Sequence, residues 1–263
     1  MDITEMVRIQ RVTREGKQDA EDLVTKELPL TIILNNQELV TLLCSPIDLN
    51  YLAIGFLFSE GLLRNKDEVK KITVDDERGM VHLETEEYKE PVKEITCKRM
   101  ITSGCGRRTA SFNTADARGQ TRIGSQFSIS AAQVLALVKQ FQRRSQIYRT
   151  TGGVHSAALC DKKSILVFNE DIGRHNAIDK VLGKCILENM PTDDRIIITS
   201  GRISSDIVLK VAKKNIPVLV SKSAPTNLGV GLADDLEITL VGFARGERMN
   251  IYTIDWRIVT NGE

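Results

Sequence analysis

The second half of the chain alternates between short apolar runs and segments with helical spacing, and this alternation limits the possible folds more than any other feature. We expect strands over residues 165–168, 196–199, 218–220, 238–241 and 250–254. Helical periodicity is expected over residues 130–148, 177–190, 205–214 and 228–236. Strands that alternate with helices favour a sheet covered by helices. We therefore predict an α/β domain over residues 128–263.

Residues 1–127 show a different pattern, in which short strand-like segments are separated by turn residues. We expect strands over residues 7–12, 30–34, 38–43, 72–74 and 80–84, with turns at residues 35–36 and 75–79. One helix is expected after Ser45, because the sequence SPID at residues 45–48 has the spacing of a capping box and Gly61 could end the helix. The prediction is a smaller β-rich α+β region over residues 1–127.

The composition is that of an ordinary globular protein. The 263 residues include 36 Lys and Arg and 35 Asp and Glu, a formal net charge of +1, so nothing indicates a nucleic-acid-binding protein. Residues 1–18 lack the apolar core of a signal peptide, and the apolar run at residues 52–63 is interrupted by polar residues and glycines. The five cysteines are irregularly spaced. We expect a cytoplasmic protein with no membrane span and no disulfide framework.

One cysteine lies in surroundings that suit a reactive thiol. Cys105 stands between Gly104 and Gly106, and Arg107 and Arg108 follow directly. The glycines leave the sulfur open, and nearby positive charge favours the thiolate, which is the nucleophilic form. The alternative is that Cys105 fills a gap in the core, as unreactive cysteines often do.

Two further segments place polar residues where a strand ends and a helix begins. In EDIGRHNAID, residues 170–179, Arg174 and His175 could contribute charge or a proton donor. In TSGRISSD, residues 199–206, the single arginine is Arg202. Ligands often bind at this edge of an α/β sheet. The alternatives are that Asp171 caps the helix while His175 is solvated, and that Ser204 or Ser205 merely caps the second helix.

The loop GFARGERMN, residues 242–250, carries Arg245 and Arg248 between two expected strands. Guanidinium groups bind planar oxyanions in two-point fashion, so this loop is a candidate for phosphate or pyrophosphate binding. A hairpin loop can also be charged for solubility alone.

Other motifs are absent or incomplete. Gly229-Val230-Gly231 lacks the third glycine of a dinucleotide-binding loop, and no Walker loop occurs. His155 lacks the glutamate of a zinc-deaminase motif, and the three histidines and scattered cysteines have no zinc-site spacing. We predict no metal site.

Five segments together resemble a known family. TSGCG, TGGVHSAAL, EDIGRHNAIDKVLG, TSGRISSDIVLKVA and GFARGERMNIYT, in this order, are similar to the formate dehydrogenase accessory sulfurtransferase family, FdhD, and the likeness extends from about Val7 to Thr253. The resemblance implies a cytoplasmic homodimer with a cytidine-deaminase-like, three-layer α/β domain that lacks the deaminase zinc site.

The resemblance also implies a function and site residues. Sulfur would pass from a cysteine desulfurase to a persulfide on Cys105, and then to the molybdenum bis(molybdopterin guanine dinucleotide) cofactor before its delivery to formate dehydrogenase. The family's cofactor contact corresponds here to Phe243, Ala244, Arg245, Gly246, Glu247 and Arg248. Arg174, His175 and Arg202 are added because they lie at the expected ligand edge of the sheet.

One position departs from the family pattern. Many members carry C-x-x-C in the thiol loop, but Arg108 occupies the second cysteine position here. A mechanism that needs an internal disulfide therefore lacks its resolving thiol, although one cysteine suffices to carry a persulfide. Two alternatives stay open: a cofactor-binding chaperone without sulfur transfer, and a hydrolase in which Cys105 is the nucleophile and His155 or His175 the base.

Overall fold

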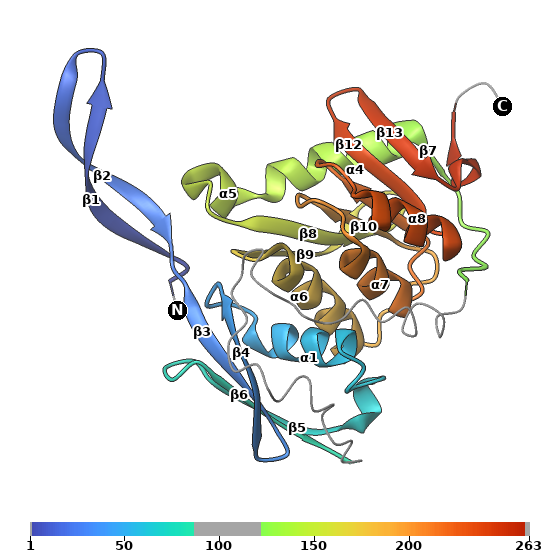
Figure 1. Ribbon diagram of the computed structural model, residues 1–263, viewed down its shortest axis with the longest axis horizontal. Helices are drawn as coiled ribbons and strands as arrows, with labels where there is room; N and C mark the ends of the chain where they lie inside the picture. Colours follow the sequence, from blue (N-terminus) through green and yellow to red (C-terminus); the bar gives the residue numbers. More distant parts are fainter. Residues whose placement is uncertain (1, 87–121, 261–263) are drawn as a thin grey trace.

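The computed structural model describes residues 2–86 and 122–260, and Figure 1 shows its helices and strands. The larger sheet has six strands in the order β13-β12-β11-β10-β8-β9. β10, β11 and β12 run parallel, whereas β8, β9 and β13 are antiparallel to their neighbours. The bounds are β8 His155–Cys160, β9 Ile165–Asp171, β10 Ile196–Thr199, β11 Val218–Ser221, β12 Thr239–Arg245 and β13 Arg248–Thr253. The prediction of an α/β architecture is confirmed.

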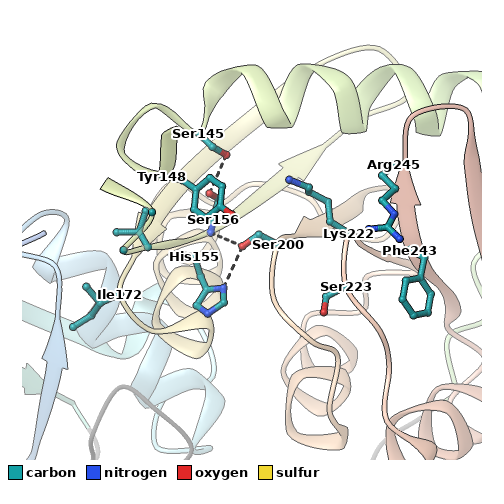
Figure 2. A pocket seen from close by; sticks show the side chains of 13 residues that line it. Ser145, Tyr148, His155, Ser156, Ile172, Ser200, Lys222, Ser223, Phe243 and Arg245 are labelled. Atoms are coloured by element: carbon teal, nitrogen blue, oxygen red, sulfur yellow. Dashed lines mark hydrogen bonds between the residues drawn. The ribbon is translucent and has the colours of Figure 1, made fainter. Parts of the chain in front are cut away.

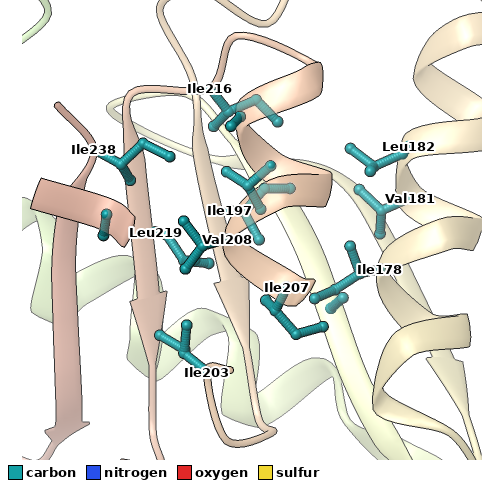
Figure 3. Close-up of a cluster of buried hydrophobic side chains, with 14 of the residues drawn as sticks. Ile178, Val181, Leu182, Ile197, Ile203, Ile207, Val208, Ile216, Leu219 and Ile238 are labelled. Atoms are coloured by element: carbon teal, nitrogen blue, oxygen red, sulfur yellow. The ribbon is translucent and has the colours of Figure 1, made fainter. Parts of the chain in front are cut away.

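Helices cover both faces of this sheet and make it the middle of three layers (Figure 1). In β10, Ile196 and Ile198 pack in the cluster that contains α4, whereas Ile197 packs in the cluster of α6, α7 and α8 (Figure 3). Successive strand residues point to opposite faces, so a continuous apolar run belongs to a strand that is buried on both sides. The helix bounds are α4 Ala131–Arg144, α5 Gln146–Thr151, α6 Arg174–Leu187, α7 Ser205–Lys213 and α8 Asn227–Asp235.

The N-terminal part contains a four-stranded sheet in the order β4-β3-β6-β5. Asn35 and Asn36 connect β3 to β4 with φ angles of 47° and 65°, which confirms the predicted hairpin turn. The helix α1 has this sheet on one side and α6, which covers the larger sheet, on the other (Figure 1). The bounds are β3 Leu28–Leu34, β4 Gln37–Cys44, α1 Leu49–Ser59, the 3-10 helix η1 Lys66–Glu68, β5 Val69–Asp75 and β6 Met80–Thr85.

Two smaller pairs of strands complete the described fold. β1 (Thr4–Thr13) and β2 (Gly16–Thr25) form an antiparallel ribbon that projects away from both sheets (Figure 1). β7 (Ile129–Ser130) pairs in parallel with β14 (Ile258–Val259), which follows the 3-10 helix η2 (Asp255–Arg257). The buried Arg257 side chain donates hydrogen bonds to the carbonyl oxygens of Ile123 at 3.0 Å and Glu237 at 2.7 Å, and so fixes the C-terminal segment.

The predicted capping box at Ser45 is wrong. α1 begins at Leu49, and the residue before it, Asp48, has a φ angle of 53° and no side-chain capping hydrogen bond. The Ser45 hydroxyl instead accepts a hydrogen bond from the backbone N–H of Ile172 at 3.2 Å. Ser45 therefore contacts the segment that follows β9, and sequence spacing cannot reveal this long-range contact. The predicted helix end is confirmed, since α1 stops at Ser59 and Gly61 follows with a φ angle of 77°.

Other differences concern helix length and missed strands. The helix predicted over residues 130–148 begins with a capping box between Ser130 and Gln133 but is divided at Ser145 into α4 and α5. The strands β2 and β8 were not predicted. The division of the chain at residues 127 and 128, and the cytidine-deaminase likeness, stay predictions. In the described ranges, every helix is too short or too polar to span a membrane.

Candidate functional site

A cavity of about 510 Å³ opens at the edge of the large sheet where the parallel strands end (Figure 2). Ser200 follows β10, Lys222 and Ser223 follow β11, and Arg245 ends β12. Because β8 runs antiparallel to β10, its first residue, His155, reaches the same edge. The carboxyl ends of parallel strands are the usual ligand position in open α/β sheets.

Two cations and two aromatic rings line this cavity. Lys222 and Arg245 come from neighbouring strand ends, and Figure 2 shows Tyr148 and Phe243 among the lining side chains. The Lys222 ammonium lies 5.9 Å from the centre of the Tyr148 ring, and partial burial lowers the pKa of Lys222. Cations beside exposed aromatic faces suit a planar ligand that carries negative charge.

A local irregularity in β12 brings Phe243 to the cavity. The register of β12 with β13 shifts between Gly242 and Arg245, and Phe243 has a φ angle of 52°. The Phe243 N–H donates to the carbonyl oxygen of Ser223 at 3.1 Å, which ties the irregular backbone to the loop after β11. Positive φ in a bulky residue is uncommon and is often retained at functional sites.

His155 faces the cavity with a hydroxyl partner. Its Nδ1 atom lies 3.3 Å from the Ser200 hydroxyl oxygen, which also accepts a hydrogen bond from the Ser156 N–H at 2.9 Å. Burial, followed by the positive charge of Arg174, lowers the pKa of His155 below its usual value. A neutral imidazole at pH 7 can accept a proton or a hydrogen bond from a bound group.

Glu170 fixes the wall that carries Tyr148. Its carboxylate accepts hydrogen bonds from the N–H groups of Ile147 at 3.2 Å and Tyr148 at 3.3 Å, in the first turn of α5. The Ser156 hydroxyl donates to the same carboxylate at 3.3 Å and lies 3.0 Å from the hydroxyl of Ser145. Burial raises the pKa of Glu170. The short helix α5 is thus held by side-chain contacts to β8 and β9.

The residues of the hairpin predicted to bind the cofactor lie in different surroundings in the structure. Phe243 and Arg245 line the cavity, whereas Ala244 is buried on the opposite side, in the cluster of α4. Gly246, Glu247 and Arg248 form the exposed turn into β13 and lie outside the set of described residues that line the cavity.

Arg174, His175 and Arg202 lie at the same sheet edge but outside that lining set. His175 Nε2 lies 2.5 Å from a carboxylate oxygen of Asp206, and only 23% of its side chain is exposed, so the solvated alternative is wrong. Burial lowers the pKa of His175, and the Asp206 contact opposes this shift. Arg174 packs its aliphatic chain against Gly201, and Arg202 is exposed.

The proposed capping roles also differ from the structure. Asp171 is fully buried and forms an ion pair with Lys180 at 2.7 Å, while Gly173 occupies the N-cap position of α6. Ser204 is the N-cap residue of α7 but makes no side-chain capping hydrogen bond. Gly229 and Gly231 lie inside α8, which confirms that they form no dinucleotide-binding loop.

Tyr148, Ser200 and Lys222 were not singled out from the sequence, and His155 was considered only for an incomplete zinc-deaminase motif and as a hydrolase base. Lys222 follows a correctly predicted strand, so the reasoning used for Arg202 would have found it. His155 begins β8, whose small residues Ser156, Ala157 and Ala158 give a weak strand signal.

The cysteines divide into two groups. Cys97 and Cys105 lie outside the described residues, as do the arginines beside Cys105. Cys44, Cys160 and Cys185 are buried and free, and burial raises the pKa of each to about 12. None of these three forms a thiolate near neutral pH. Within the described ranges, no group of three or more His, Cys, Asp or Glu side chains is placed to hold a metal ion.

Comparison with known proteins gives consistent matches over most of the chain. Residues 25–259 match the model of the FdhD/NarQ family. A Bacillus pumilus (strain SAFR-032) protein named "Sulfur carrier protein FdhD" is 43% identical over 246 residues, covering 93% of this chain and 94% of that protein. The protein of the same name from Bacillus subtilis (strain 168) is 43% identical over 238 residues, covering 90% and 91%.

A solved structure is similar as well. It is a crystal structure of a Desulfotalea psychrophila protein provisionally described as a formate dehydrogenase accessory protein. The match has a TM-score of 0.82 and 26% sequence identity, and it covers 98% of this chain and 100% of that one.

Proposed function

Because this chain belongs to the FdhD/NarQ family, we propose that it is a sulfur carrier protein that acts in the maturation of a formate dehydrogenase. The observation that carries the proposal is the likeness, over more than nine-tenths of the chain, to relatives named sulfur carrier proteins. A carrier of this kind needs a thiolate to accept sulfur and a surface that binds the recipient.

The carrier thiol is Cys105. The three described cysteines are unsuitable because burial raises the pKa of each to about 12. Of the two that remain, Cys105 is flanked by glycines and followed by two arginines, which favours an accessible thiolate. Cys97 lacks the flanking glycines.

Sulfur loading proceeds by exchange with a cysteine desulfurase persulfide. The Cys105 thiolate attacks the outer sulfur, a new S–S bond forms to Cys105, and the S–S bond of the desulfurase persulfide breaks. The desulfurase cysteine leaves as a thiolate, and Cys105 holds the persulfide. The exchange needs no second cysteine in this chain, so Arg108 does not prevent it.

The recipient is the molybdenum bis(molybdopterin guanine dinucleotide) cofactor, which is the client of this protein and is bound in the cavity at the sheet edge. Lys222 and Arg245 suit its pyrophosphate groups, and the Tyr148 and Phe243 rings suit its planar bases. The finished cofactor then passes to formate dehydrogenase. The family resemblance further implies a homodimer.

Mass spectrometry tests the carrier step. The protein is incubated with a cysteine desulfurase and cysteine, and peptides are searched for one added, reductant-labile sulfur. We expect the sulfur on the Cys105 peptide, its loss in Cys105→Ser, and its retention in the matched variant Cys97→Ser. Sulfur on Cys97 alone would contradict the assignment of the carrier.

A cofactor chaperone without sulfur transfer is the second candidate, and Arg108 in place of a second cysteine favours it. Formate dehydrogenase activity in cells that carry only Cys105→Ala separates the two. Full activity would support the chaperone, whereas loss of activity with unchanged cofactor binding supports the sulfur carrier.

A further inference from the structure

The helix α5 is a short wall of the cavity with little stability of its own. It has six residues and lies between the chain break at Ser145, where α4 ends, and Gly152, whose φ angle is 66°. A helix of this length is not stable alone, and the N–H groups of its first turn have no partner within the helix. Ser145, the N-cap residue, makes no side-chain capping hydrogen bond. The first turn of α5 therefore depends on acceptors from elsewhere in the fold.

Glu170 of β9 supplies these acceptors. One of its carboxylate oxygens accepts from the Ile147 N–H, and the other accepts from the Tyr148 N–H and the Ser156 hydroxyl. A carboxylate is also the charge that the N-terminal end of a helix favours. Glu170 is only 4% exposed and lies outside the set of described residues that line the cavity. It therefore influences a bound ligand through the residues that it holds and not by direct contact.

Tyr148 is the residue that links this carboxylate to the cavity. The residue lines the cavity and is 48% exposed, and the Lys222 ammonium lies 5.9 Å from the centre of its ring (Figure 2). An exposed ring beside a cation can stack on a planar base while the cation binds a phosphate group. Because Glu170 holds the backbone of the turn that carries Tyr148, it determines where the ring lies.

We propose that Glu170 is a positioning residue that sets the affinity of the cavity for the base of its nucleotide ligand, by holding the Tyr148 ring in place. The inference rests on the proposed function, in which the ligand is a guanine dinucleotide cofactor. The phosphate groups are bound separately, because Lys222 and Arg245 come from the ends of β11 and β12 and not from α5. Loss of the Glu170 contact therefore weakens recognition of the base and leaves recognition of the pyrophosphate in place.

Titration calorimetry with two probes, guanosine diphosphate and inorganic pyrophosphate, tests the proposal. Glu170→Gln keeps the size of the side chain, but in either orientation its amide turns a donor toward the N–H of Ile147 or Tyr148. We expect about tenfold weaker binding of guanosine diphosphate in Glu170→Gln and in Tyr148→Leu, and a change of less than about threefold for pyrophosphate. Gln146→Ala, at an exposed position of the same helix, is the matched control and should change neither affinity.

A double-mutant cycle separates positioning from a general loss of stability. If Glu170 acts through the ring, Glu170→Gln should weaken binding by less than about twofold in a protein that already carries Tyr148→Leu. Glu170→Asp, which keeps the charge on a shorter side chain, is taken through the same cycle, so that failure of one variant to fold leaves the test in place. Circular dichroism checks the folding of each variant.

Three outcomes would overturn the inference and leave the proposed function intact. They are an unchanged affinity for guanosine diphosphate in the Glu170 variants, an equal loss of affinity for both probes, and a full additional loss in the protein that carries Tyr148→Leu. A wild-type protein that does not bind guanosine diphosphate would instead contradict the cofactor site itself, and the inference with it.

Discussion

Gly183 of α6 lies directly against the backbone of α1 at Gly55. A Cβ atom on Gly183 would lie 2.8 Å from the amide nitrogen of Gly55 and 1.9 Å from the carbonyl oxygen of Tyr51. A Cβ atom on Gly55 would lie 1.9 Å from the carbonyl oxygen of Asp179. The two helices therefore cross in backbone contact. This crossing joins the N-terminal part of the chain, through α1, to the domain that holds the candidate site (Figure 1).

Alanine at either position should force the helices apart. We expect Gly183→Ala and Gly55→Ala each to lower the free energy of unfolding by about 3 kcal/mol, because the backbone atoms in the way cannot move aside as a flexible side chain would. Urea denaturation followed by circular dichroism measures the change. Gly231→Ala in α8 is the matched control, since its Cβ meets nothing within 4 Å. That variant should gain up to about 1 kcal/mol from helix propensity, and equal effects at all three positions would contradict the crossing.

Local patterns in the sequence predict the elements well but not the contacts between them. The strand at residues 196–199 has the predicted bounds, and α7 begins at the predicted Ser205, because apolar runs and helical spacing are local properties. Gly55 was only an interruption in an apolar run. Its role depends on Gly183, which lies in α6, more than 120 residues further along the chain. Ser45 was misassigned for the same reason, since its partner Ile172 is about as distant in sequence.

Lys180 and Asp171 form a fully buried ion pair at 2.7 Å, and Lys180 also donates to the carbonyl oxygen of Ser45 at 3.2 Å. Removal of the cation would leave a buried carboxylate without its counter-charge. Lys180→Met should therefore cost about 3–5 kcal/mol of stability. Arg78→Met, which removes an exposed pair with Asp75, should cost less than about 1 kcal/mol. Chemical denaturation compares the two, and similar losses would contradict a buried pair.

The candidate site was predicted in part. The rule that ligands bind where strands end directs attention to the sheet edge where the cavity lies, and it places Arg174, His175 and Arg202 there. The cavity walls come partly from other residues, because β8 and the break between α4 and α5 at Ser145 were not predicted. The register shift in β12 decides whether Arg245 or Arg248 faces the cavity. A single sequence does not indicate where such a shift occurs.

The cavity makes a specific prediction about the paired arginines. Arg245 and Lys222 line it, whereas Arg248 lies beyond the hairpin turn. With guanosine diphosphate as the probe, we expect Arg245→Ala and Lys222→Ala each to weaken binding about tenfold, through loss of a charge-assisted hydrogen bond. Titration calorimetry measures the affinity. Arg248→Ala is the matched control with a small expected effect, and a larger loss there than at Arg245 would move the site to the hairpin tip.

Two partly buried imidazoles should make stability depend on pH. Burial lowers the pKa of both His155 and His175, so the folded protein keeps them neutral below the pH at which they titrate in the unfolded chain, about 6.5. In that range the unfolded chain binds more protons at these two positions, so their contribution to the free energy of unfolding falls as the pH decreases from about 7 toward 5. Through this effect the two histidines destabilise the folded state in mild acid and leave its stability unchanged well above pH 6.5.

His155 is the clearer position for a test, because His175 is in direct contact with the carboxylate of Asp206, which opposes the lowering of its pKa. Urea denaturation at several pH values is compared for the wild type and His155→Gln. The difference between their free energies of unfolding cancels the contributions of groups that both proteins share. One such group is Glu170, whose raised pKa makes the protein more stable as the pH falls. We expect the difference to shrink or reverse as the pH falls, since the variant has no imidazole to protonate at this position. His82→Gln, at an exposed position, controls for the loss of an imidazole as such. If the free energy of unfolding depends on pH in the same way in the wild type and in His155→Gln, the His155 ring is solvated in the folded protein.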